Sequence, residues 1–89
     1  MGAARLEAKR LGEKLSQIRN AFGLSQSEML RRLGFEDVLV YNRISDYEHG
    51  KREPPLPVLL QYARLAGVHV DVLIDDELDL PARLPVKQK

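Results

Sequence analysis

The sequence predicts an all-α fold, a compact domain of five short helices. Apolar residues recur at the three- and four-residue spacing of amphipathic helices in five successive segments, and glycines or prolines stand between these segments. The chain has 89 residues, 44% of them hydrophobic, which is enough to bury a single core. We therefore expect one domain over residues 1–80, a flexible C-terminal tail over residues 81–89, and helices near residues 6–22, 25–33, 40–48, 57–66 and 70–75.

The first helix is predicted from one apolar stripe. Its members recur at helical spacing, so they lie on one side of a helix that faces the core. Gly23 follows the stripe and is placed as the C-terminal stop. The residues of the stripe are Leu11, Leu15, Ile18 and Phe22.

The second helix is predicted to begin at a capping box. The hydroxyl of Ser25 and the carboxylate of Glu28 can each accept a hydrogen bond from a free backbone N–H group at the helix start. Gly34 is the expected stop. A helix of about nine residues is marginal in isolation, so it must be stabilised by packing against the first helix. Its buried face is predicted to consist of Met29, Leu30 and Leu33.

The segment 35–39 allows two interpretations. It is either a loop that holds Phe35 and Val38 against the core, or an early start of the next helix with Asp37 as its cap. The helical pattern then becomes clear again, and Gly50 is the expected stop. The apolar residues at helical spacing in this third helix are Val40, Ile44 and Tyr47.

Prolines introduce the fourth helix. The segment Lys51–Pro57 reads KREPPLP and is expected to form a stiff connector, with Pro57 in the first turn of the helix. Gly67 ends this helix, and His69 is a candidate cap for a short fifth helix. The apolar faces of these two helices are predicted to contain Leu59, Tyr62, Ala63, Ala66, Val70, Leu73 and Ile74.

Cysteine content and charge bear on where the protein is found in the cell and on what it binds. The sequence has no cysteine, no apolar run of membrane-spanning length and no signal-peptide pattern, so we expect a cytoplasmic protein that does not contact a membrane. The net charge is only +1, yet basic residues recur through the first two thirds of the chain, while Asp71–Asp79 carries only acidic charges. Basic residues gathered on one face would bind phosphates, whereas scattered ones would be ordinary surface charge.

Four motifs in order carry a family resemblance. They are IRNAFGLSQ (18–26), SQSEMLRRLG (25–34), RISDYEHGKREP (43–54) and LLQYARLAGV (59–68), the last followed by DVLI. Together they resemble the helix-turn-helix family of the phage Cro and repressor proteins, often called the XRE family. The resemblance covers most of the chain and implies a λ-repressor-like domain that binds double-stranded DNA.

The resemblance also implies which residues meet DNA. Gln26 corresponds to a glutamine that contacts the DNA backbone or an edge base, and Lys51 corresponds to a phosphate contact. Asn42 and Arg43 fall where recognition residues enter the major groove, and there Asn pairs with adenine and Arg with guanine, although Arg43 is alternatively a phosphate ligand. The full set of candidate DNA-binding residues is Gln26, Ser27, Tyr41, Asn42, Arg43, Ser45, Asp46, Lys51 and Arg52.

Two of these candidates leave alternatives open. Tyr41 either meets a thymine methyl group or a phosphate, or it is a partly buried core aromatic. Asp46 departs from the family, because phosphates repel an acid, so it either accepts a hydrogen bond from a cytosine amino group or points away from DNA. Arg19 and Glu48 match positions that in relatives form a structural ion pair between the first helix and the end of the third.

The turn between the second and third helices is the main departure from the family. Gly34 and Ile44 are ten positions apart, about four more, or one helical turn, than in most relatives. Either the third helix starts a turn earlier or the loop bulges beside the DNA backbone. Which residue within 40–43 first meets the groove therefore stays open.

The sequence favours binding over catalysis. His49 and His69 are isolated, without a nucleophile or metal-ligand spacing, and the acidic run DDELD lacks the later glycine and glutamate of a calcium loop. We expect no enzyme activity, no cofactor and no metal. The leading hypothesis is a sequence-specific transcriptional regulator that binds double-stranded DNA as a homodimer. The alternative is a protein-interaction module of the same fold, either an antitoxin or an adaptor subunit of a larger regulator.

Overall fold

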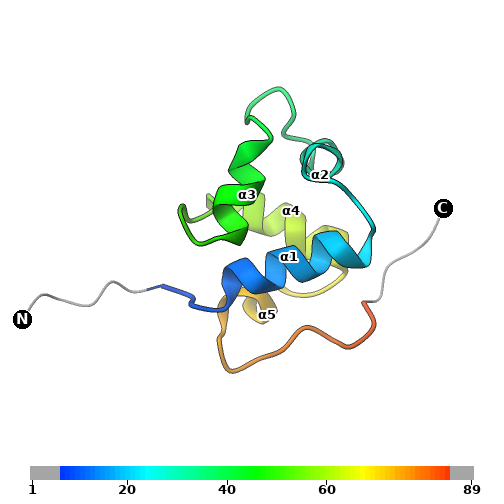
Figure 1. Ribbon diagram of the computed structural model, residues 1–89. Coiled ribbons are helices and arrows are strands. Elements are labelled where there is room, and N and C mark those ends of the chain that lie inside the picture. Colours follow the sequence, from blue (N-terminus) through cyan, green and yellow to red (C-terminus); the bar gives the residue numbers. More distant parts are fainter. Residues whose placement is uncertain (1–6, 85–89) are drawn as a thin grey trace, which may run out of the picture.

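Five α-helices make up the part of the chain that the computed structural model describes, residues 7–84, and this part contains no strand (Figure 1). The all-α, five-helix prediction is confirmed. None of these helices has the length and apolar character needed to cross a membrane. The helices are α1 (Leu11–Ala21), α2 (Gln26–Leu33), α3 (Asn42–Glu48), α4 (Leu56–Ala66) and α5 (Val70–Ile74).

The start of α1 lies later than the sequence pattern suggested. The helix begins at Leu11 rather than near residue 6, which itself lies outside the described residues. The two residues before the helix are fixed instead by Asp76, whose carboxylate accepts hydrogen bonds from the backbone N–H groups of Lys9 and Arg10, each at 3.0 Å. These bonds, first that of Arg10 and then that of Lys9, lower the pKa of Asp76.

The core is built from the apolar stripes of all five helices. The predicted stripes of α2 and α4 are buried, and so is that of α1 except for Phe22, which is partly buried. Two predicted positions were wrong: the side chain of Val40 is 58% exposed and that of Ile74 is 46% exposed. Val40 precedes α3 and Ile74 is the last residue of α5, so helical spacing continues in the sequence at positions that do not pack on the core.

The α2 capping box is present as predicted. The Ser25 hydroxyl accepts a hydrogen bond from the Glu28 backbone N–H at 3.1 Å, and the Glu28 carboxylate accepts one from the Ser25 backbone N–H at 2.8 Å. The bond from the Ser25 backbone, followed by that from its side chain, lowers the pKa of Glu28. Gly34 then ends the helix in the left-handed conformation at φ 88°. The helix packs mainly against α3 and α4, so the prediction that the first helix would be its main support was wrong.

Gly12 lets α1 approach the end of α3. A Cβ atom at this position would lie 2.5 Å from the backbone oxygen of Glu48 and 3.0 Å from that of Tyr47. No side chain fits there without displacing backbone. The last turn of α3 therefore rests directly on the first turn of α1.

An ion pair joins the other end of α1 to the same turn of α3. Arg19 Nε donates to Glu48 Oε2 at 2.7 Å, and Nη2 donates to Oε1 at 3.0 Å. Arg19 Nη1 also donates to the backbone oxygen of Leu24 at 3.0 Å, which adds the α1–α2 loop to the contact. The side chains of Arg19 and Glu48 are 18% and 5% exposed, respectively. The hydrogen bond to Glu48 raises the pKa of Arg19.

Lys14 ties α1 to α5. Its side chain is fully buried, and Nζ donates to the backbone oxygens of Val72 at 2.8 Å and Asp75 at 2.9 Å. These carbonyls belong to the C-terminal end of α5, where a positive charge is favourable. Lys14 is thus a structural residue, and its buried ammonium group is not available to bind a phosphate.

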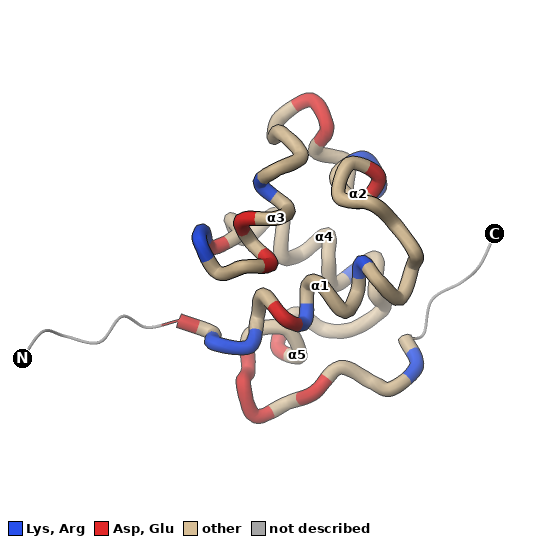
Figure 2. The backbone as a smooth tube through the Cα atoms, in the orientation of Figure 1, with Lys and Arg blue, Asp and Glu red and all other residues tan. Residues whose placement is uncertain are grey.

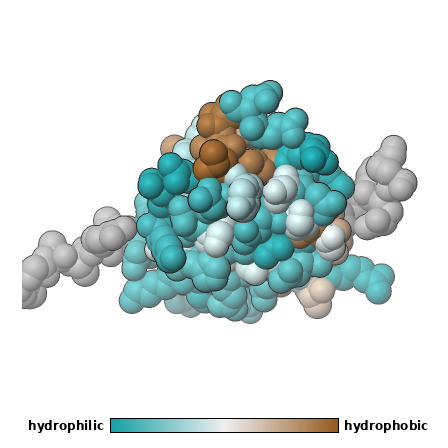
Figure 3. Space-filling view, turned by 45° about the horizontal axis from the view of Figure 1, so that its top comes forward, coloured by the Kyte–Doolittle hydropathy of each residue, from teal (hydrophilic) through white to brown (hydrophobic). Residues whose placement is uncertain are grey.

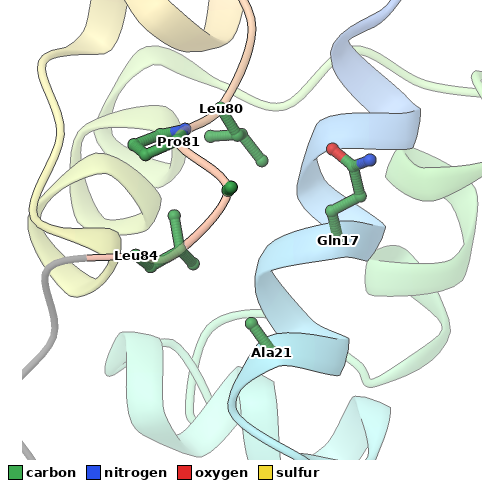
Figure 4. Close-up of a pocket in the computed structure, with 6 residues that line it drawn as sticks. Gln17, Ala21, Leu80, Pro81 and Leu84 are labelled. Carbon is green, nitrogen blue, oxygen red and sulfur yellow. The ribbon is translucent and has the colours of Figure 1, made fainter.

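The segment after α5, which we call the strap (residues 75–84), crosses α1 on the side away from the α2–α3 turn (Figure 1). Arg10 forms an ion pair with Asp79, near the middle of the strap. Further along, Leu80 and Leu84 pack against the core, opposite Gln17 and Ala21 of α1 (Figure 4). The first four residues of the predicted tail, 81–84, thus lie along α1, and residues 85–89 are outside the described part.

Replacing Arg19 with alanine should destabilise the protein strongly. The change leaves the buried Glu48 carboxylate without its counter-charge, and we expect the free energy of unfolding to fall by about 3–5 kcal/mol. Urea denaturation measures the effect. Arg31→Ala is the matched control, because its pair with Glu36 is exposed at 69% and 54%, and it should change stability by no more than about 0.5 kcal/mol. Equal midpoints for the two variants would contradict this role of Arg19.

Gly12→Ala should also destabilise the protein. Helix propensity alone favours alanine by about 1 kcal/mol, but the added methyl group must push α1 and α3 apart, so we expect a net loss of about 1–3 kcal/mol. The same denaturation experiment measures it. Gln17→Ala, an exposed position on the same helix, supplies the comparison and should leave stability unchanged. A Gly12→Ala variant more stable than the natural protein would show that the two helices do not meet so closely.

Candidate nucleic-acid interface

The outer face of α3 carries most of the predicted site residues. Ile44 and Tyr47 are buried and Glu48 is paired with Arg19, which leaves the other side chains of this seven-residue helix facing outward. Asn42 is exposed at its start, and Arg43, Ser45 and Asp46 are partly exposed along it. The helix can present polar groups to a ligand because its other face is fixed by the contacts with α1.

Asp46 lies between two of the predicted basic contacts. Its Oδ2 atom is 3.6 Å from Arg43 Nη1 and 3.4 Å from Arg52 Nε, and its side chain is 25% exposed. Neither sequence interpretation of Asp46 included these partners. The three-residue spacing from Arg43 could have suggested the first pair, whereas the second depends on how the following loop folds.

That loop returns the chain onto α3. The backbone N–H of Lys51 donates to the backbone oxygen of Asp46 at 2.8 Å, after Gly50 takes the left-handed conformation at φ 73°. Lys51 and Arg52 are exposed there, and Figure 2 shows basic residues at this loop. The structure therefore brings Arg43 and Arg52 to the same carboxylate, and Lys51 precedes Arg52 in the loop.

Two further candidates lie on the neighbouring helix. Gln26 and Ser27 begin α2, directly after the capping residue Ser25; Gln26 is partly exposed and Ser27 is exposed.

On α3, the hydroxyl of Ser45 is 3.2 Å from His49 Nδ1, and the same nitrogen is 2.9 Å from the Ser45 backbone oxygen. His49 thus has an ordinary polar role on its own helix.

The lengthened turn is a separate structure and does not extend α3. The backbone N–H groups of Val38 and Leu39 donate to the backbone oxygen of Phe35 at 2.9 and 2.8 Å. Phe35 and Leu39 pack against the core, so the expectation that Val38 would do so was wrong; Val38 is 75% exposed. The core interpretation of Tyr41 was also wrong, because its side chain is 58% exposed.

The acidic residues of the C-terminal part lie away from α3. Lys14 and Arg19 are taken up by internal contacts, and Arg10 is paired with the strap. The acidic residues of α5 and the strap lie below α1 in Figure 2, away from α2 and α3. A polyanion bound at α3 would therefore lie away from the acidic residues of α5 and the strap.

Comparison with known proteins identifies the family. The sequence model of a helix-turn-helix family, HTH_3, matches residues 15–73, about two thirds of the chain and a span that reaches from α1 into α5. A search of curated protein sequences finds no match. The chain therefore belongs to the Cro/repressor-like (XRE) helix-turn-helix family, a family of DNA-binding regulators.

Proposed function

We propose that this protein is a transcriptional regulator that binds double-stranded DNA in a sequence-specific manner and reads the major groove with α3. The observation that carries the proposal is the outward face of α3, with Asn42 exposed at its start and its inner face fixed by Ile44 and Tyr47. A helix presented in this way fits the width of the B-DNA major groove.

Seven of the nine candidate residues have a definite role in this proposal. Asn42 hydrogen-bonds adenine, and Arg43 reads guanine from the next position of the helix. Asp46 positions Arg43 and Arg52, because one carboxylate oxygen lies near both guanidinium groups. Lys51 and Arg52 contact phosphates, and Gln26 and Ser27 do so from the first turn of α2, where backbone N–H groups also favour an anion.

We further propose that the protein acts as a homodimer on a two-fold symmetric site. One seven-residue helix reaches only a few base pairs, too few to select a site from a genome. Two copies bound to half-sites about one DNA turn apart, roughly 34 Å, would multiply the discrimination of each.

Selection from random DNA duplexes tests this function. We expect one sequence to be enriched, with two related half-sites, and its affinity to fall steeply between 50 and 200 mM salt because phosphate contacts release counterions, about one for each contact. Failure to enrich any sequence would contradict the proposal. A protein-interaction module such as an antitoxin or an adaptor would then explain the fold better.

The two classes of contact predict different mutant behaviour. Asn42→Ala should relax the preference at one base position of each half-site, at a cost of about 1–3 kcal/mol for the preferred base. Lys51→Ala should weaken binding to all duplexes alike and make the salt dependence shallower by about one counterion per subunit. Binding measured against the selected site and its single-base variants separates them. Identical effects of the two substitutions on every duplex would refute this division of roles.

A further inference from the structure

The lengthened turn exposes apolar side chains next to α3. Val38 is 75% exposed, and Val40 and Tyr41 are each 58% exposed. They lie in consecutive or nearly consecutive positions that lead directly into Asn42. Figure 3 shows hydrophobic surface near the top of the molecule, where Figure 1 places this turn. We call Val38 and Val40 the valine pair.

The fold holds the valine pair outward. Phe35 and Leu39 are partly buried and pack against the core, and two backbone hydrogen bonds to the Phe35 oxygen close the turn between them. A collapse of the pair onto the core would have to displace these anchors. The turn thus keeps apolar groups in water, which is unfavourable unless a ligand covers them.

The acidic residues beside the valine pair limit which group can cover it. Glu36 and Asp37 stand at the tip of the turn, where Figure 2 shows acidic residues, and only Glu36 has a basic neighbour, Arg31 at 3.3 Å, among the ion pairs of residues 7–84. Carboxylates at this place disfavour close contact with phosphates. The base edges in the floor of the groove carry no such charge, and the apolar group exposed there is the 5-methyl group of thymine.

The position along the chain also fits the groove. Val40 precedes Asn42 by two residues, a span of at most about 7 Å. Base pairs follow one another at about 3.4 Å along the DNA axis. Val40 can therefore meet a base up to about two steps from the one that Asn42 reads.

We propose that the valine pair, Val40 above all, packs against a thymine methyl group in the major groove, so that the lengthened turn extends the sequence read by α3. This inference rests on the proposed function and adds a determinant of specificity to it. It assigns a purpose to the extra residues of the turn, which anchor two apolar side chains inward and present two outward.

Replacement of thymine by deoxyuridine tests the contact, because it removes the 5-methyl group and leaves the pairing edge unchanged. The duplex is the one selected by the protein, with each thymine replaced in turn. At one or two positions next to the base read by Asn42, the dissociation constant should rise about fourfold, which corresponds to about 0.8 kcal/mol for a methyl-sized apolar group. In Val40→Ala, the thymine and deoxyuridine duplexes should bind almost equally at that position.

The control is Leu78→Ala, which shortens an apolar side chain 38% exposed on the strap and should keep the full preference for thymine. Equal binding of thymine and deoxyuridine duplexes at every position by the natural protein would overturn the inference, as would a full preference in Val40→Ala or a selected site without thymine there. In these cases specific binding that depends on Asn42 would persist and the proposed function would stand. Absence of any enriched duplex would overturn both.

Discussion

The fixed attachment of α3 to α1 is the constraint on which the rest of the structure depends. A helix of seven residues is too short to be stable by itself, so its direction must be set by its neighbours. Two contacts set it at the same turn of α3: the bidentate pair of Arg19 with Glu48, and the close approach of the Glu48 backbone to Gly12. Ile44 and Tyr47 complete the attachment from the core. With its C-terminal end held in this way, the start of α3 and the turn before it project outward, and every proposed base contact follows from that projection.

The distribution of charge has a second consequence for binding. Three basic residues that could have met phosphates have internal partners: Lys14 caps α5, Arg10 is paired with the strap, and Arg19 is paired with Glu48. Asp46 further offsets the charge of Arg43 and Arg52. With a net charge of only +1, the sequence-independent attraction to DNA is weaker than in a strongly basic domain. On the proposed function, base contacts then account for a larger share of the affinity, and the valine pair adds to these contacts without adding charge.

Much of the fold could be predicted from local sequence. Helical spacing identified the five helices, and the capping box at Ser25 and the glycine at Gly34 fixed the ends of α2, because these signals depend only on near neighbours. Val40 and Ile74 were assigned to the core because spacing alone does not reveal where a helix leaves it. The burial of Lys14 and the place of Gly12 against α3 depend on residues far along the chain, so no local pattern marks them. The pair of Asp46 with Arg43 follows helical spacing, whereas its pair with Arg52 depends on how the loop after α3 folds. The positions of Arg19 and Glu48 came from the family resemblance, and the conformation of the lengthened turn came from the structure alone.

The central claim is that DNA meets the start of α3 and the turn before it. Amide chemical-shift mapping by NMR, with the selected duplex titrated into the labelled protein, measures this most directly. We expect large shift changes in the first turn of α2 and over residues 38–52, and little change along α5 and the strap. Changes confined to α5 and the strap, with α3 unaffected, would contradict the claim.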